Sequence, residues 1–247
     1  MKRLIGWCMP ILLVLTLSVS AGETTYGMHD GWRFIVSPLA GVDRNEMTVR
    51  QRDTQETMTD TGPMYGLFAM AVHPNWVINN FLFYADVNNT DVWGNLLFAN
   101  YYADAKAALT WNVGAGYLYH EIRPDRGKIK VEVPMVKAGP VFRVQPLRLS
   151  INPYMGYAWE QVSTPGGDQD NDSILYGLTL GWHWRMLQAG VNYYYQDSRD
   201  LDENFHTLRA RLVALVSPHW GILGRIDYME HPTTDDLSFL AGPVFVF

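Results

Sequence analysis

The chain has 247 residues, a formal net charge of −6 at pH 7, a hydrophobic fraction of 48% and one cysteine. Nucleic-acid binding favours clustered Lys and Arg, so the acidic balance argues against a nucleic-acid partner. One cysteine excludes a framework of intrachain disulfides. Because no Pro- or Ser-rich linker and no shift of composition divides the chain, we predict a single folded domain.

The amino end has the pattern of a secretory signal peptide. Lys2 and Arg3 precede an apolar run over residues 11–19, and small residues follow this run. We therefore predict a cleaved signal peptide over residues 1–21 and a mature domain over residues 22–247. The apolar run is too short and too early to serve as a permanent transmembrane helix.

From Trp32 onward, apolar residues recur at every second position in short segments, a pattern typical of β-strands. Twelve such strands are predicted, over residues 32–42, 63–73, 76–87, 92–103, 108–120, 128–144, 147–160, 173–185, 187–196, 205–216, 220–230 and 237–247. Ten or fourteen strands also fit. The segments 63–73 and 92–103 are apolar on both faces, and the alternation within 128–144 changes phase near Pro134.

The connections between these segments are alternately short and longer. The short ones are residues 73–76, 104–107, 144–146, 185–186 and 217–219, and the longer polar ones are 43–62, 88–91, 121–127, 161–172, 197–204 and 231–236. Membrane β-barrels join their strands in this way, with short periplasmic turns and longer external loops. An even strand count then predicts that both termini are periplasmic. Whether the 43–62 loop folds inward and narrows the barrel stays open.

Large aromatic residues cluster at the two ends of the predicted strands. Those near the predicted external ends are Tyr117, Tyr119, Tyr157, Trp159, Tyr176, Tyr193, Tyr195 and Tyr228, and Trp182 and Trp184 lie at the other end. Amphipathic rings are expected at both membrane interfaces, so this placement favours a membrane barrel over a soluble one.

The last segment, residues 237–247, alternates between an aromatic-rich face and a face of small and aliphatic residues. Phe245 and Phe247 lie on the aromatic face, and Phe247 ends the chain. This ending resembles the C-terminal signature of Gram-negative outer-membrane β-barrels, which the assembly machinery of that class recognises. The resemblance implies an all-β, antiparallel transmembrane barrel in the outer membrane. It also implies the assembly machinery, outer-membrane lipid and lipopolysaccharide as partners, and it points to no specific family within the class.

The inward faces of the predicted strands are polar and contain several charges. Arg209, Arg211 and Arg225 fall on two adjacent strands with Asp227 nearby, and Arg148 and Glu160 fall on an earlier strand. A stripe of arginines would attract anionic solutes, with Glu160 and Asp227 on the opposing wall. In the alternative interpretation these residues pair with one another and brace the lumen, because a confined charge is costly unless paired.

One external segment has spacing that suggests a cation. Asp168, Asp170 and Asp172 alternate as in a calcium loop, but the glycine and glutamate that complete the motif are missing. A solvated loop explains these residues equally well. We expect no cofactor.

These observations predict a narrow porin-like channel for passive passage of small hydrophilic solutes, among which the arginine stripe would favour anions. One alternative is a non-conducting structural or adhesive barrel whose acidic external loops bind a partner. Another is a lipid-modifying barrel enzyme that uses Ser and His. The seven histidines show none of the local spacings of such enzymes, so a protein without catalytic activity is predicted.

Overall fold

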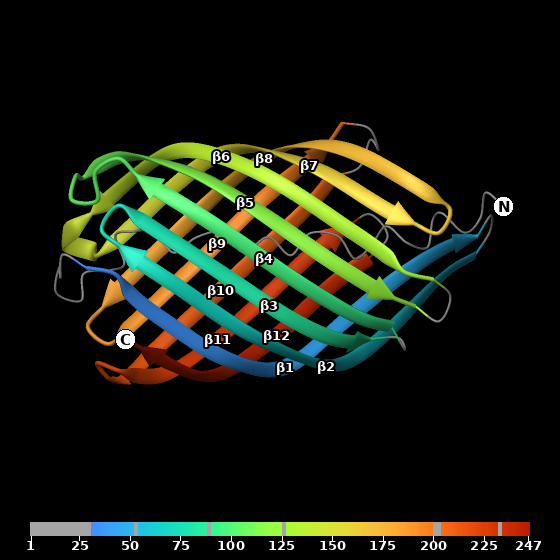
Figure 1. The fold of residues 1–247 in the computed structure, drawn as a ribbon, viewed down its shortest axis with the longest axis horizontal. Helices are drawn as coiled ribbons and strands as arrows, with labels where there is room; N and C mark the ends of the chain where they lie inside the picture. Colours follow the sequence, from blue (N-terminus) through green and yellow to red (C-terminus); the bar gives the residue numbers. More distant parts are fainter. Residues whose placement is uncertain (1–30, 52–53, 88–89, 125–126, 200–203, 232–233) are drawn as a thin grey trace.

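The computed structural model describes residues 31–51, 54–87, 90–124, 127–199, 204–231 and 234–247, so the predicted signal peptide lies outside the described residues. Twelve antiparallel strands form one closed barrel (Figure 1), which confirms the predicted fold class and strand number. The strands are β1 (Arg33–Gln51), β2 (Thr54–His73), β3 (Trp76–Val87), β4 (Thr90–Tyr102), β5 (Leu109–Arg123), β6 (Ile129–Val144), β7 (Leu149–Thr164), β8 (Gly167–Trp184), β9 (Leu187–Ser198), β10 (Asn204–Ser217), β11 (Trp220–His231) and β12 (Thr234–Val246). In the described part of the chain, no helix has the length and apolar character to cross a membrane.

Pairing between β1 and β12 closes the barrel. The register runs from Ile35 opposite Val246 to Met47 opposite Thr234. At the end of this seam Phe34 and Phe247 exchange backbone hydrogen bonds of 3.1 and 2.8 Å. Each strand therefore has two neighbours, as the hydrocarbon of a membrane requires for backbone amides and carbonyls.

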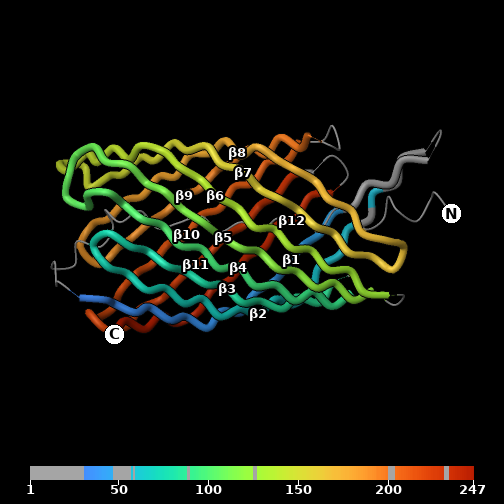
Figure 2. Tube along the Cα trace, turned by 45° about the horizontal axis from the view of Figure 1, so that its top comes forward, coloured from blue at the N-terminus to red at the C-terminus, as the bar shows by residue number. Residues whose placement is uncertain are grey.

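Two of the predicted long loops are strands instead. Residues 43–62 continue β1 and β2, which pair as far as Gln51 opposite Thr54. Residues 161–172 continue β7 and β8, which pair to Thr164 opposite Gly167 and extend at the barrel end opposite the C-terminus (Figure 2). The alternation of apolar residues did not reveal these strand extensions, because a hairpin that projects into water has polar residues on both faces. Much of the sequence that was predicted as long external loops therefore belongs to longer strands.

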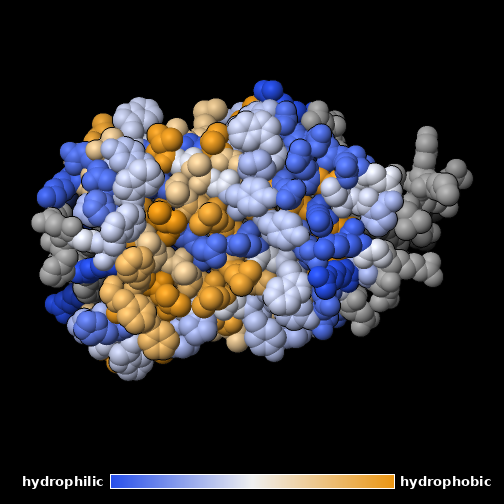
Figure 3. Space-filling view, viewed as in Figure 1, coloured by the Kyte–Doolittle hydropathy of each residue, from blue (hydrophilic) through white to orange (hydrophobic). Residues whose placement is uncertain are grey.

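The outward face has the layers expected of a membrane barrel. At the end with the shorter hairpins, Trp76, Trp111 and Trp184 are exposed by 40%, 61% and 46%. Exposed aliphatic residues follow towards the middle, among them Leu82, Leu97, Val113, Met155, Leu178, Val191, Leu208 and Ile222. A second layer of exposed aromatic residues contains Tyr65, Trp93, Tyr117, Trp159, Tyr176 and Tyr193. Figure 3 shows the apolar band across the middle of one face, with hydrophilic residues towards the ends.

Tyrosines of the second aromatic layer bond to polar side chains on neighbouring strands. Tyr84 donates to Asp91 over 2.7 Å, and Tyr117 donates to Glu132 over 2.6 Å. Rings that face lipid while their hydroxyl groups reach polar partners are typical of the membrane interface. This layer therefore marks one boundary of the membrane-spanning zone.

Candidate functional site

The lumen has an apolar half and a polar half. The inward residues of β2 to β6 are mostly apolar and include Met64, Phe68, Met70, Val72, Val77, Phe81, Phe83, Leu96, Phe98, Leu118, Val131, Val133 and Met135. Those of β7 to β11 are mostly polar and include Ser150, Asn152, Thr179, His183, Asn192, Gln196, Thr207, Arg209, Arg225 and Asp227. An apolar lumen wall explains why the segments 63–73 and 92–103 have two apolar faces.

The predicted arginine stripe lies on the inner wall at β10 and β11, as the sequence pattern indicates. Arg209 is the register partner of Asp227, and Arg211 is the register partner of Arg225. The Asp227 carboxylate lies 2.6 Å from Nη2 of Arg225 and 3.5 Å from Nε of Arg209. Asp227 is therefore on the same wall as the arginines, and its predicted place on the opposing wall is wrong.

Arg211 and Arg225 are register partners with like charges, and each guanidinium lies over a different aromatic ring. The guanidinium carbon of Arg225 lies 4.0 Å from the centroid of Phe81 on β3. That of Arg211 lies 5.7 Å from the centroid of Phe68 on β2. A guanidinium over an aromatic face gains about 0.5–2 kcal/mol. Three strands separate the partners of each contact, so these arginines cross part of the lumen.

The opposite half of the lumen contains a cation that the sequence analysis did not identify. Lys137 on β6 is buried, with Nζ 4.5 Å from the Tyr154 ring centroid and 5.0 Å from that of Phe98. The predicted change of phase near Pro134 obscured its direction. In the structure the alternation keeps one phase from Ile129 to Val141, and this uninterrupted pattern is the signal that places Lys137 inward.

Glycines make room for the aromatic rings along the wall. A Cβ on Gly177 would lie 2.0 Å from the Tyr154 ring, and one on Gly116 would lie 2.1 Å from the Phe98 ring. Across Gly177, the Tyr154 hydroxyl donates to Oδ1 of Asn192 over 3.2 Å. Tyr154 also lies close enough to Arg209 for the two groups to interact electrostatically. The rings therefore connect the cations of the two walls.

Together these contacts form a layer of side chains across the lumen, which we call the lumen belt. Its members are Phe68, Phe81, Phe98, Lys137, Tyr154, Arg209, Arg211, Arg225 and Asp227. Cations on both walls give this layer a positive character, although the chain as a whole is acidic.

A pair of acidic residues lies beside the lumen belt. Asp43 on β1 and Asp236 on β12 bond to one another through their side chains. Together with Asp227, these carboxyl groups lie close to the arginines and oppose their positive charge.

Two other predicted lumen residues lie away from the stripe. Glu160 lies towards the outer end of β7, where its Oε2 accepts a hydrogen bond of 3.3 Å from Asn171. Arg148 does not lie in a strand, because it caps the short 3-10 helix η3 (Gln145–Leu147) with a left-handed φ of 52° and is exposed. Glu160 therefore does not form an acidic wall against the arginines, and Arg148 lies at the end of the barrel.

The predicted calcium residues lie in the extended β7–β8 hairpin. Asp168, Asp170 and Asp172 pair through their backbones with Ser163, Gln161 and Trp159. In the described part of the chain, no group of three or more His, Cys, Asp or Glu residues is arranged to hold a metal ion. Phe245 and Phe247, the residues of the predicted assembly signal, lie on the outward face, exposed by 41% and 74%.

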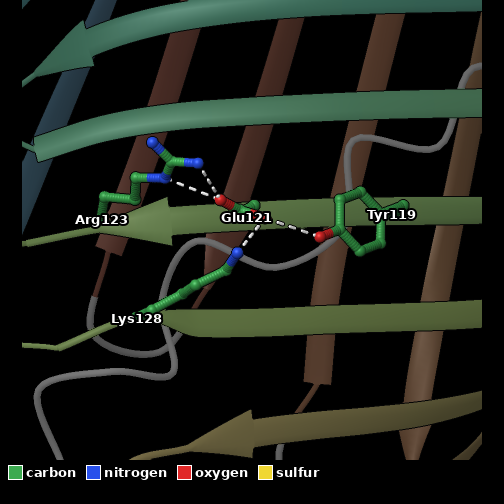
Figure 4. Close-up of polar contacts among 4 residues, drawn as sticks. All are labelled: Tyr119, Glu121, Arg123 and Lys128. Atoms are coloured by element: carbon green, nitrogen blue, oxygen red, sulfur yellow. Dashed lines mark hydrogen bonds and ion pairs between the residues drawn. The ribbon is translucent and has the colours of Figure 1, made fainter.

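An ionic cluster holds the β5–β6 hairpin at the barrel rim (Figure 4). Its centre is the Glu121 carboxylate, which accepts hydrogen bonds from the Tyr119 hydroxyl over 2.8 Å and from Nε of Arg123 over 2.7 Å. Nζ of Lys128 lies 2.6 Å from the same carboxylate. The cluster therefore joins the end of β5 to the segment that precedes β6.

Comparison with known proteins supports the fold. No protein-family model and no curated protein sequence matches the chain. The translocator domain of the autotransporter NalP from Neisseria meningitidis matches with a TM-score of 0.52 and 14% identity, over 92% of this chain and 91% of that one. The NanC porin matches with a TM-score of 0.52 and 11% identity, over 83% of this chain and 98% of that one. The chain has the fold of an outer-membrane β-barrel. At these identities the likeness concerns the fold, and such barrels include both a porin and a secretion domain.

Proposed function

We propose that this outer-membrane barrel is a narrow, anion-preferring channel for small solutes. The observation that supports it is the lumen belt, in which arginines project from β10 and β11 and Lys137 projects from β6. Rings of Arg and Lys in a pore favour anions. The low dielectric constant of the surrounding wall strengthens their field. The proposal assigns no catalytic activity to the chain.

The same proposal gives the barrel an orientation. One rim of the barrel contains the first residues of β1, the last residues of β12 and the shorter hairpins. The opposite rim contains the extended hairpins β1–β2 and β7–β8. Outer-membrane barrels have their longer extensions outside the cell, so we propose that the start of β1 and the end of β12 face the periplasm. Lipopolysaccharide and the assembly machinery are the partners expected of a protein in this position.

The test is single-channel recording of the purified, folded barrel in a planar bilayer under a gradient of potassium chloride. We expect stable steps and a reversal potential that favours chloride. Joint replacement of Arg209, Arg211 and Arg225 by Gln should move this potential towards zero or towards cation preference. Arg123→Gln at the rim is the control, because it removes one positive charge outside the lumen. A conducting triple variant with unchanged selectivity would reject the proposed role of the stripe.

A folded barrel without conductance would favour a structural or adhesive function. The observation behind this second candidate is the β7–β8 hairpin, which extends beyond the apolar band and presents Asp168 and Asp170 as exposed side chains. Binding of the folded protein to host or bacterial surface components would then be the property to measure.

A further inference from the structure

We propose that the lumen selects organic anions with an apolar body, such as aromatic carboxylates, over fully hydrophilic anions. This inference rests on the proposed channel function and specifies its class of solute. It follows from the division of the lumen into a mostly apolar half, which contains Lys137, and a polar half, which contains the arginines.

The first observation is the chemistry of the wall that faces the arginines. Phe81 and Phe83 on β3 and Phe98 on β4 face inward. A channel for fully hydrophilic solutes offers polar groups on all sides, whereas most inward side chains of this half are apolar, with Asn79, Asn100 and Asn112 among the exceptions. A hydrophilic anion would lose water along that half and gain few hydrogen bonds in return, which is unfavourable. An apolar ring or chain gains free energy on the same surface.

The second observation is that aromatic and cationic groups already lie together on both sides of the lumen. Arg225 contacts the face of Phe81, and Lys137 contacts the rings of Phe98 and Tyr154. A solute that combines a carboxylate with an apolar body matches this juxtaposition. Its carboxylate fits the planar donor fork of a guanidinium, while its body lies against the neighbouring phenyl rings.

Other classes of solute match only one half of the lumen. A neutral hydrocarbon contacts the phenylalanine wall, but it displaces water from Arg209 and Arg225 without replacing their hydrogen bonds. A sugar can bond to Asn152, Thr179 and Asn192 on one side but meets apolar side chains on the other. Chloride is attracted by the cations, but it has no apolar surface that could contact the apolar wall. An apolar carboxylate satisfies both halves at once.

The test compares two anions under bi-ionic conditions, with chloride on one side of the bilayer and benzoate or glycerate on the other. Glycerate is the smaller anion and is fully hydrophilic, so sieving by size alone favours it. We expect the opposite order, with benzoate more permeant by about tenfold, the ratio that corresponds to about 1.4 kcal/mol. The whole folded barrel is used, and its folded state is checked by heat-dependent migration on a gel.

Two variants separate the contributions of the two halves. Phe81→Gln should lower the benzoate-to-glycerate permeability ratio, because it replaces a ring of the apolar wall with an amide. Arg225→Gln should lower the permeability of both anions relative to sodium, because it removes charge. If Phe81→Gln does not fold, Phe98→Gln tests the same wall from the neighbouring strand.

The outcomes distinguish this inference from the proposed function. Steps in chloride with glycerate equal to or more permeant than benzoate would overturn the solute class and leave an anion channel. A folded barrel without conductance in any of the three salts would overturn both. A preference for benzoate that Phe81→Gln reduces would support the inference.

Discussion

The guanidinium carbon of Arg225 lies 4.0 Å from the centroid of the Phe81 ring, although three strands of the barrel wall separate β11 from β3. Such a contact forms only if both side chains project from the wall and meet inside the barrel. Arg211 and Phe68 make a similar, longer contact of 5.7 Å between β10 and β2. These two pairs narrow the lumen on one side and hold the arginines at defined positions.

Truncation of the Phe81 ring should widen the lumen. In the variant Phe81→Ala we expect a larger single-channel conductance, because the Phe81 ring meets Arg225 inside the barrel and its removal leaves space there. Phe34→Ala is the matched control, since Phe34 is exposed by 51% on the outward face. A conductance that is the same in wild type and Phe81→Ala, with both folded, would show that the narrowest section lies elsewhere.

Neutralisation of Asp227 should affect both selectivity and stability. Asp227→Asn removes the carboxylate that lies 2.6 Å from Arg225 and 3.5 Å from Arg209. Loss of one partner of a buried ion pair costs about 3–5 kcal/mol, so the unfolding midpoint in urea should fall. Anion preference should increase, because positive charge is no longer balanced.

The control for this variant is Asp168→Asn on the exposed β7–β8 hairpin, which should change neither property. If Asp227→Asn unfolds at the wild-type urea concentration, then Asp227 does not brace the arginines.

Substitution of Gly177 should disturb the ring that lies over it. A Cβ at this position would lie 2.0 Å from Tyr154, so Gly177→Ala must displace the ring and its hydrogen bond to Asn192. Overpacking of this kind costs about 1–3 kcal/mol. Gly224→Ala on β11 is the control, because no atom lies within 4 Å of a Cβ there.

A double-mutant cycle with Tyr154→Ala completes this test. If the ring is the obstacle, Gly177→Ala should cost much less when Tyr154 is already alanine. An equal cost in both backgrounds would point to the backbone instead.

Removal of the Glu121 charge should loosen the β5–β6 hairpin. Glu121→Gln replaces the carboxylate that binds Arg123 and Lys128 at the rim. We expect faster tryptic cleavage after Lys128 in the folded barrel, with little change in global unfolding, because ion pairs with exposed cationic partners contribute little to stability. Glu132→Gln, which removes only the carboxylate bonded to Tyr117, should leave this cleavage rate unchanged.

Alternation along the chain is enough to locate the strands and to assign the faces of many residues. Alternation along a strand depends on local backbone geometry, so a period of two located twelve strands and correctly placed Arg209, Arg211 and Arg225 on the inner wall. The same signal disappears where both faces meet the same environment. It therefore missed the strand extensions within residues 43–62 and 161–172, where both faces are polar.

Contacts between side chains across the lumen depend on the three-dimensional closure of the barrel. Contact between Arg225 and Phe81 requires closure of the barrel through β1 and β12, and its distance depends on the registers of all the intervening strands. The same applies to Lys137 between Phe98 and Tyr154 and to Asp227, which lies on the arginine wall. The alternation in the sequence indicates whether each side chain points into or out of the barrel. It does not give the curvature of the sheet that brings distant strands together. For that reason the division of the lumen into an apolar half and a cationic half emerged only from the closed barrel.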